Sequence, residues 1–478
     1  MLIFKMNRCV SKIDNNMYSI DCYNPFENDC LFSIISSFID EMAINCNIEF
    51  IELIYPNNPY LRFKRFRTYL ANGIDEFNYL ISMNAYDDYD VNSLDSLFST
   101  LIIGLYYGVS SDEYHLIKNL AFSEPFYNDL MAIYNPIDIF ILNATINRKY
   151  TPPIKQLNDK FFTEENDVNC YKIKNKCTIA LVGNLASGTN SSIDVIKAVK
   201  NFKPTCFIHL GNVYNSGRLN EYKNNLVTPV KTYLPNTKAF IVPGNHSYYS
   251  GSQGFEYALQ SFNQHASYFS IYNKNVQIQG IDTSYYNSSP SNAFSDQFNP
   301  VNSYEVEWHN NRVINAKVNG RRIIYLSHHS PVSFQTPLGK IDGLTTCINP
   351  TLHDQFANTI DDLDLWFFSQ ERSFNLMQPY IYNDHVIVRP RLIGNSSLIY
   401  QKENLSNFPG DFEADNNIVP LPVPIGVYPK RYLSMLNPTF TIIKVNTKQI
   451  KVKYYQLPQI EMGIYDKPDL LYQEIIEL

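Results

Sequence analysis

Three segments of the chain repeat one pattern, an apolar run that ends in a loop rich in glycine and asparagine. They are CTIALVGNLASGT (177–189), TCFIHLGNVYNSG (205–217) and KAFIVPGNHSYYSG (238–251). Helical periodicity follows the first run, through Ile193, Val195 and Val199. Apolar strands that alternate with helices and end in polar loops are typical of an α/β layered domain. In such a domain the functional site lies at the carboxyl ends of the strands.

The later part of the chain extends this pattern and then changes. NVQIQGIDTSYY (275–286), RRIIYLSHHSPVSF (321–334) and DDLDLWFFSQERSFNL (361–376) each predict a further strand with a polar loop behind it. Beyond Pro420, FTIIKVNTKQIKVKYYQL (440–457) alternates apolar and polar residues on both sides of a short polar turn. This alternation predicts a C-terminal β-hairpin.

The first third of the chain has a different texture. Apolar residues recur at helical spacing over 31–42, 94–105 and 112–134, which predicts a helical domain. The polar, proline-bearing segment 151–167 is typical of a linker. We therefore predict three parts: a helical N-terminal domain (1–165), an α/β domain (166–405) and a C-terminal β extension that packs on it (406–478).

Charge, cysteine content and hydropathy exclude several classes of protein. The formal net charge of −7 provides no basic footprint for nucleic acid, and the eight cysteines form no Cys-x-x-Cys pair. The most apolar run, Leu101–Tyr107, is far shorter than the ~20 residues of a spanning helix. No apolar stretch follows the early lysine, so we expect a protein that is cytoplasmic or exported without a cleaved signal peptide.

The polar loops, taken together and in this order, resemble those of the calcineurin-like metallophosphoesterase superfamily, in its purple acid phosphatase-like bacterial branch. The resemblance covers about residues 172–400. It implies an α/β/β/α sandwich that holds two metal ions, which bind a phosphate and activate a hydroxide. Five segments carry it: His209–Gly217, Pro243–Gly251, Glu305–His309, Leu326–His329 and Trp366–Leu376.

Anionic residues are missing where this resemblance places metal ligands. Asn184 and Asn212 stand at positions of aspartates, the second of which bridges the two metals in the family. Ser247 follows the retained pair Asn245 and His246 in place of Asp or Glu. An amide oxygen is neutral, so these replacements leave the charge of two buried cations without compensation.

Histidine ligands of the family's motifs are missing as well. The family's last motif, Gly-His-x-His, is Ser-Gln-Glu-Arg here, with Gln370 and Arg372 at the histidine positions. One strand-end histidine remains, and the sequence leaves open whether His328 or His329 faces the site. Tyr214 stands where purple acid phosphatases have a tyrosine ligand, although looser relatives have tyrosine there for packing.

These replacements predict a pseudophosphatase: a catalytically inactive protein without metal or other cofactor that acts as a binding, scaffold or effector component for a protein partner. One alternative is a metal-dependent phosphoesterase with a rewired, mononuclear site on Asn245, a histidine and Asp282. Another makes the helical first domain the functional part. No nucleic-acid partner and no membrane span are expected. The predicted vestigial site comprises Asn184, Asn212, Tyr214, Asn245, His246, Ser247, His328, His329, Gln370 and Arg372.

Overall fold

The computed structural model describes a two-sheet α/β sandwich in the second and third parts of the chain. The described residues are 167–188, 190–214, 217, 219–248, 252–286, 300–333, 338–341, 344–371, 373–387, 389–397, 423–432, 435–461 and 464–478. The predicted helical domain (1–165), nearly all of the predicted linker, and Arg372 lie outside them.

The first sheet is mixed and has seven strands in the order β1-β5-β6-β7-β10-β14-β11. Its pairs are parallel except β5 with β6 and β11 with β14, which are antiparallel. The strands are β1 (Cys170–Lys172), β5 (Phe269–Tyr272), β6 (Val276–Gly280), β7 (Arg322–Leu326), β10 (Leu365–Phe368), β11 (Phe374–Leu376) and β14 (Pro390–Ile393).

The second sheet is also mixed and has six strands in the order β21-β18-β17-β2-β3-β4. Strands β2, β3 and β4 are parallel to one another, and the remaining pairs are antiparallel. The strands are β2 (Cys177–Val182), β3 (Cys206–His209), β4 (Lys238–Ile241), β17 (Thr439–Val445), β18 (Gln449–Gln456) and β21 (Asp469–Glu477).

Four two-stranded hairpins accompany the two sheets. They pair β8 (Gly339–Ile341) with β9 (Leu344–Thr346), β12 (Tyr380–Tyr382) with β13 (His385–Ile387), β15 (Arg431–Tyr432) with β16 (Met435–Leu436), and β19 (Gln459–Glu461) with β20 (Ile464–Tyr465).

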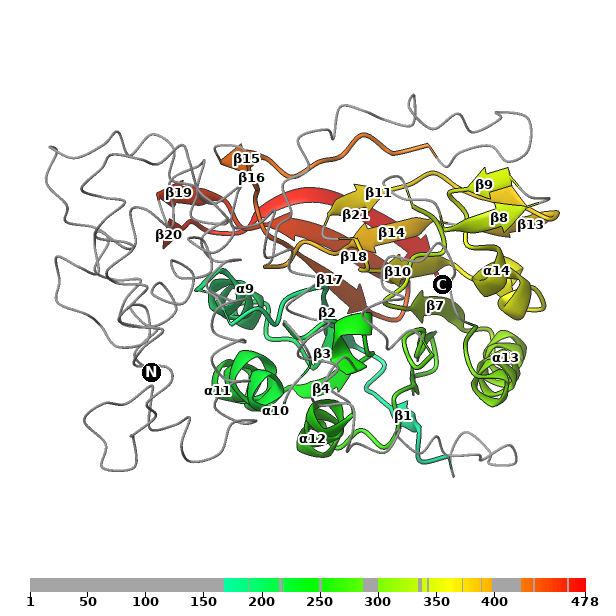
Figure 1. The fold of residues 1–478 in the computed structure, drawn as a ribbon, viewed down its shortest axis with the longest axis horizontal. Coiled ribbons are helices and arrows are strands. Elements are labelled where there is room, and N and C mark those ends of the chain that lie inside the picture. The colour runs from blue at the N-terminus through cyan, green and yellow to red at the C-terminus, as the bar shows by residue number, and fades with distance from the viewer. Residues whose placement is uncertain are drawn as a thin grey trace, which may run out of the picture. The chain divides into compact units, whose positions relative to one another are not determined.

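Helices cover the outer face of each sheet, so the layers run helix, sheet, sheet, helix (Figure 1). On the six-stranded side lie α9 (Asn190–Lys200), α10 (Leu219–Glu221), the π-helical turn η4 (Tyr222–Val227), α11 (Thr228–Tyr233) and α12 (Gln253–Phe262). On the seven-stranded side lie α13 (Ser303–Val318), α14 (Pro350–Phe356) and η7 (Ile360–Asp362). The short 3-10 turn η5 (Asn245–Tyr248) follows β4.

Alternation along the strands produces these layers. In β2, Ile179 and Leu181 join the core between the sheets, whereas Ala180 and Val182 face the helices. Because successive strand residues point to opposite faces, an unbroken apolar strand is the pattern of a sheet that is covered on both sides. The predicted α/β/β/α sandwich is confirmed for the described residues.

The predicted C-terminal hairpin is confirmed too, because β17 and β18 pair in antiparallel register from Val445 with Ile450 to Thr439 with Gln456. Strand β17 also pairs with β2, so the C-terminal strands belong to the six-stranded sheet itself. The division of the chain into three domains stays a prediction. None of the described helices is long and apolar enough to cross a membrane.

Candidate functional site

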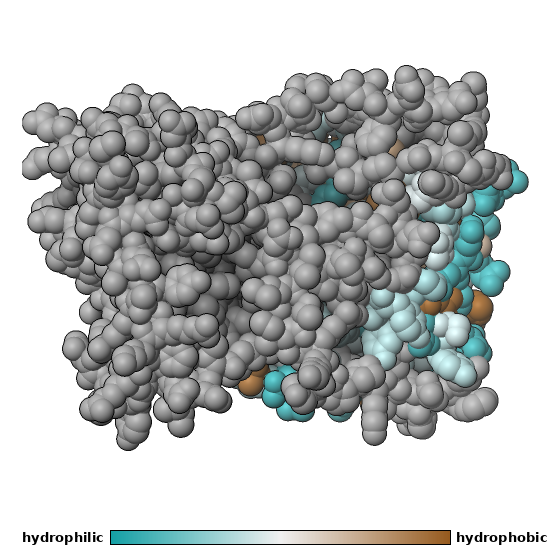
Figure 2. Space-filling model, in the orientation of Figure 1, coloured by the Kyte–Doolittle hydropathy of each residue, from teal (hydrophilic) through white to brown (hydrophobic). Residues whose placement is uncertain are grey.

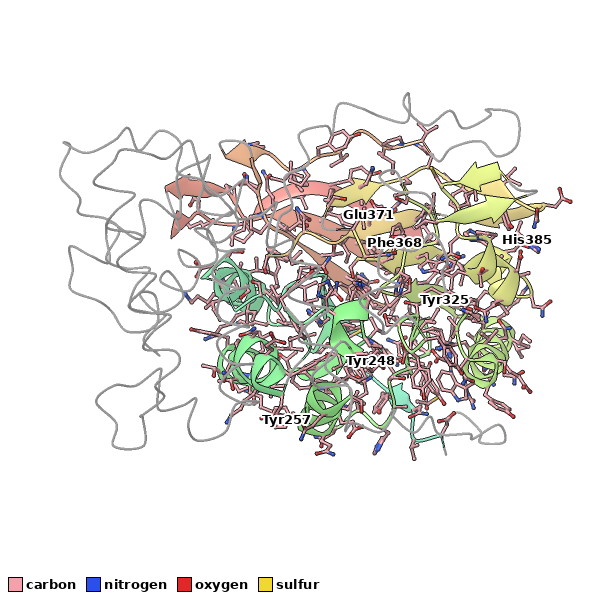
Figure 3. All side chains as sticks on the ribbon, viewed as in Figure 1. Tyr248, Tyr257, Tyr325, Phe368, Glu371 and His385 are labelled. Carbon is pink, nitrogen blue, oxygen red and sulfur yellow. The ribbon has the colours of Figure 1, made fainter. Side chains whose placement is uncertain are left out.

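Five loops meet at the carboxyl ends of β2, β3, β4, β7 and β10, as the resemblance implied. Hydrogen bonds between their side chains and backbones connect them directly. Figure 3 labels Phe368 at the end of β10 and Glu371 in the loop behind it. Of the ten predicted site residues, the structure brings nine to this edge of the sandwich, and Arg372 lies outside the described residues.

Asn184, in the loop after β2, is fully buried and uses both ends of its amide. Its Nδ2 donates to the carbonyl oxygens of Ser369 (2.5 Å) and Gly394 (2.9 Å). Its Oδ1 accepts from the hydroxyl of Tyr214 at 2.7 Å and from Asn212 Nδ2 at 3.1 Å. Since carbonyl oxygens only accept, the amide nitrogen must face them, and this defines the orientation of the side chain.

Asn212, in the loop after β3, continues this network. Its Nδ2 donates to Asn184, and its Oδ1 accepts the backbone N–H of His246 at 3.1 Å. Both asparagines adopt a left-handed backbone conformation, with φ of 54° at Asn184 and 64° at Asn212. Asparagine tolerates this conformation better than most residues, so Asn184 and Asn212 suit the backbone of the loops that follow β2 and β3.

After β4, the Asn-His-Ser-Tyr segment (Asn245–Tyr248) forms a short 3-10 turn. Ser247 is buried, and its Oγ accepts the backbone N–H of Gly244 at 2.9 Å, so the serine stabilises its own turn. His246 is 7% exposed, and its ring centroid lies 5.0 Å from that of Tyr214. The side chain of Asn245 is half-buried and points to the loop after β7.

His328 is the strand-end histidine that faces the site. Its Nδ1 lies 2.9 Å from the carbonyl oxygen of Leu210, and its Nε2 lies 3.2 Å from the amide of Asn245. Because a carbonyl oxygen only accepts, His328 Nδ1 carries a proton and donates it to Leu210, which leaves Nε2 to contact the amide of Asn245.

His329 points away from this group. Its Nδ1 lies 2.9 Å from the hydroxyl of Thr283 and 3.4 Å from that of Ser284, both in the loop after β6. Burial, with a further contribution from neighbouring His328, lowers the pKa of His329 well below its usual value, so the ring is neutral. We assign it a structural role in joining the loops behind β6 and β7.

The loop after β10 contacts the site mainly through its backbone. Gln370 donates its backbone N–H to the carbonyl oxygen of His328 at 2.8 Å, and its Oε1 accepts from Ser330 N at 3.2 Å. Ser369 contacts Leu210 through a short Oγ–H bond and lies 3.1 Å from His328 Nδ1. Gln370 therefore attaches this loop to the loop after β7.

The carboxylate of Asp282, a metal ligand in the mononuclear alternative, accepts hydrogen bonds that stabilise the loop after β6. Its Oδ1 accepts the backbone N–H groups of Ser284 and Tyr285, each at 2.9 Å, and its Oδ2 accepts the hydroxyl of Tyr248 at 2.9 Å. The backbone N–H of Asp282 donates to Glu305 Oε1 at 2.7 Å. Burial raises the pKa of Asp282 to about 6.

Sequence reasoning missed the partners that hold these side chains. Gly394, whose carbonyl accepts from Asn184, follows β14, and no local pattern links the two residues. Tyr248 lies inside the quoted motif, but its bond to Asp282 depends on the packing of two loops. Glu305 also lies in a quoted segment, in which its role was not assigned.

Comparison with known proteins supplies a family match and structural neighbours. Residues 178–369 match the family model of the calcineurin-like phosphoesterases. No curated protein matches the sequence.

Solved structures with a similar chain path include a purple acid phosphatase from seeds of yellow lupin (Lupinus luteus), with 11% identity and a TM-score of 0.39 over 63% of this chain and 54% of that one. The chain thus spans about half the length of the lupin enzyme. A dimetal phosphatase from Danio rerio has 10% identity and a TM-score of 0.37, over 62% of this chain and 98% of that one. PhoD has 10% identity and a TM-score of 0.41, over 63% and 70%.

Proposed function

We propose that this chain, whose residues 178–369 belong to the calcineurin-like phosphoesterase superfamily, is a catalytically inactive member that serves as a binding or assembly component. The observation that carries the proposal is the amide of Asn184, which makes four hydrogen bonds inside the former ligand group. Its assignment to a purple acid phosphatase-like bacterial branch stays a prediction.

The donors at this site fit a dimetal centre poorly. Among the described residues, no three His, Cys, Asp or Glu side chains gather in a group that could hold a metal ion. The oxygens of Asn184 and Asn212, which would have to bind the ions, accept hydrogen bonds from Tyr214 and from the backbone of His246. Two buried cations need anionic ligands nearby, and neutral amides do not supply that charge.

The hydrogen bonds also replace what metals do for structure in such a site. A metal pair holds several loops together through shared ligands; here Asn184, Asn212 and His328 join the loops after β2, β3, β4, β7 and β10. A site in which former ligand positions satisfy one another keeps the sandwich intact without a cation. Such a scaffold can present its surface to a protein partner.

Metal content and phosphatase assays test the inactive state directly. Protein loaded with Mn, Fe or Zn and then dialysed is expected to retain no stoichiometric metal and to hydrolyse neither p-nitrophenyl phosphate nor bis-p-nitrophenyl phosphate. Retention of two metal equivalents per chain would overturn the proposal. Metal-dependent hydrolysis that His246→Ala abolishes would do so as well.

The variant Asn184→Asp distinguishes between two interpretations of the site, a network of amide hydrogen bonds and a weakened metal site. In the network, a carboxylate oxygen would face the carbonyl oxygens of Ser369 and Gly394, so the variant should lose about 3 kcal/mol of stability whether or not metal is added. In a metal site, the new carboxylate would instead restore a ligand, and Mn²⁺ would raise the melting temperature of the variant.

Asn273→Asp is the matched control. Asn273 is buried outside the site, and its Nδ2 also donates to a carbonyl oxygen, that of Lys174, at 3.1 Å. Its stability loss should therefore be comparable and equally insensitive to Mn²⁺. Selective stabilisation of Asn184→Asp by Mn²⁺ would count against the proposal that the protein is catalytically inactive.

One observation favours the second candidate, a phosphoesterase with a mononuclear site. His328 Nε2 lies 3.2 Å from Asn245 Oδ1, and an imidazole nitrogen with an amide oxygen is a pair of neutral ligands that a single metal ion would use. Asp282 adds no ligand because its carboxylate binds Tyr248 and two backbone N–H groups. Metal-dependent activity lost in His328→Ala would establish this candidate.

A further inference from the structure

The end of the sandwich opposite the candidate site carries a group of exposed lysines. Lys174 and Lys176 precede β2, Lys274 lies in the turn between β5 and β6, and Lys448 lies in the turn between β17 and β18. These turns adjoin the amino ends of β2 and β6, whereas the site lies at the carboxyl ends of the parallel strands. None of the four lysines makes an ion pair with a described residue. We call this group the lysine end.

Hydrogen bonds hold the turns of the lysine end together. The turn between β5 and β6 contacts both of the others: Asn273 Nδ2 donates to the carbonyl oxygen of Lys174 at 3.1 Å, and Asn275 Nδ2 donates to that of Asn446 at 2.7 Å. Asn446 Oδ1 in turn accepts the backbone N–H of Lys448 at 2.8 Å. The four ammonium groups therefore extend from neighbouring turns whose backbones are fixed relative to one another.

Carboxylates near the lysine end are mostly paired with other residues. Asp364 lies 3.3 Å from Arg322, and Asp362 lies 2.6 Å from Lys317. Glu477, at the end of β21, is exposed. The four lysines outnumber this carboxylate, so a chain with a formal net charge of −7 has a positive end.

We propose that the lysine end binds the surface of an anionic membrane, with its ammonium groups against the phosphates and carboxylates of the lipid headgroups. The proposal is independent of whether the phosphatase site is active. Each lysine near such a surface strengthens binding about fivefold, so four of them support a reversible association. The attraction decays over a Debye length, about 10 Å at 0.1 M salt, so acidic parts of the chain that lie farther from the surface are screened from it.

The residue types at the lysine end favour a lipid surface over a nucleic acid. Two arginines at this end have structural contacts: Arg322 Nε donates to the carbonyl oxygen of Glu477 at 2.9 Å, and the guanidinium of Arg321 lies 4.8 Å from the ring centre of Tyr272. The three turns that carry the lysines contain no aromatic residue. Nucleic-acid sites typically use arginine for bidentate contacts and exposed rings for base stacking, whereas lysine acts as a mobile point charge.

An exposed hydrophobic residue at the same end favours a membrane over an acidic protein. Val318 ends α13 and is 83% exposed, and the turn behind it leads to Arg322, whose backbone N–H donates to the carbonyl oxygen of Asn275 at 3.0 Å. On the described surface seen in Figure 2, hydrophobic areas are small and lie among hydrophilic ones. A single aliphatic side chain beside lysines suits a bilayer, because it enters the headgroup region while the ammonium groups stay at the phosphates.

Co-sedimentation of the full chain with lipid vesicles tests the proposal. Phosphatidylcholine vesicles with about 30% phosphatidylserine should bind the protein at about 0.1 M salt and release it at about 0.5 M, and pure phosphatidylcholine vesicles should not bind it. Lys274→Glu/Lys448→Glu should weaken binding roughly tenfold or more. Lys223→Glu/Lys467→Glu is the matched control, because Lys223 of η4 and Lys467, which precedes β21, are exposed and lie away from the lysine end. Its binding should stay within about twofold of wild type.

Val318→Ser distinguishes a membrane from other anionic partners. It should weaken binding to the phosphatidylserine vesicles roughly threefold or more, because an apolar contact with the bilayer is lost. A protein that does not bind these vesicles would overturn the proposal, and so would equal losses in the two charge-reversal pairs. Binding to a DNA duplex or to polyglutamate that is as tight as vesicle binding and unaffected by Val318→Ser would overturn it too, and would assign the lysine end to a nucleic acid or an acidic protein.

Discussion

At the scale of single residues, the buried carboxyl of Asp282 is the group with the clearest chemical consequence. Burial raises its pKa from 3.8 to about 6 in spite of hydrogen bonds, among them those from Ser284, Tyr285 and Tyr248, that favour the charged form. The folded state therefore holds the proton more tightly than the unfolded chain does. Stability from this group is fully present below pH 4 and is lost as the pH rises through 6.

Asp282→Asn should remove this pH dependence. Asparagine keeps an oxygen for the backbone N–H groups of Ser284 and Tyr285, and its Nδ2 donates to Tyr248 once that hydroxyl reverses its role. Relative to wild type, the variant should gain about 3 kcal/mol between pH 4 and pH 7. Urea denaturation across this range measures the difference, and a constant offset between the proteins would contradict the assignment.

The hydroxyl of Tyr214 belongs to the same scale. Tyr214→Phe removes its hydrogen bond to Asn184 Oδ1 and should cost about 1–2 kcal/mol, because the buried acceptor loses one of its two donors. Tyr257→Phe is the control. Tyr257 lies half-buried on α12 (Figure 3), and its hydroxyl makes no hydrogen bond to another described residue. Equal stability of the two variants would show that the hydroxyl of Tyr214 does not stabilise the network.

At the scale of elements, the loops after β3 and β4 approach each other too closely for side chains. A Cβ on Gly211 would lie 2.7 Å from His328 Nδ1 and 2.8 Å from the backbone nitrogen of Gly244, at a φ of +92°. Gly320 also has a positive φ, +68°, but a Cβ there would meet nothing within 4 Å. The two glycines share a positive φ, which would strain any other residue, and differ in crowding.

Gly211→Ala should therefore be far more damaging than Gly320→Ala. The exposed site should lose only the ~1–2 kcal/mol of left-handed strain, whereas the crowded one should lose about 3 kcal/mol or more because backbone must move. Thermal unfolding of both variants measures the gap. Similar losses would show that the two loops separate without cost.

Individual strands were the most predictable elements because each is a run of apolar residues bounded by polar ones. The hairpin of β17 and β18 was equally visible in its alternation. The choice between His328 and His329 was not, since both follow the same strand and only the packed loops distinguish them. The partner of Asn184 at Gly394 depends on the position of β14 beside β10, which no local pattern encodes.

At the scale of the whole molecule, a buried ion pair connects the two sheets. Arg391 of β14 donates from Nε and Nη2 to the two oxygens of Glu474 in β21, at 2.9 and 2.8 Å. The hydroxyl of Tyr454 in β18 donates to the same carboxylate at 2.5 Å. The pair lies where the layers meet, so both charges rely on the sandwich staying closed.

Glu474→Ala should cost about 3–5 kcal/mol, because it leaves the guanidinium of Arg391 buried without its counter-charge. Asp362→Ala, which breaks the exposed pair with Lys317, should cost no more than about 1 kcal/mol. Urea unfolding of the two variants compares a buried with an exposed pair. A loss below 1 kcal/mol for Glu474→Ala would mean that water reaches Arg391.

The pairing of β17 with β2 has a consequence for the folding of this chain during its synthesis. β2 is among the first strands of the sandwich to be synthesised, and its neighbour on one side is among the last. Until β17 emerges, one edge of β2 leaves its backbone N–H and C=O groups unpaired in the middle of a future sheet. The six-stranded sheet should therefore close only after β17 has left the ribosome, and nascent chains should depend on holding chaperones until then.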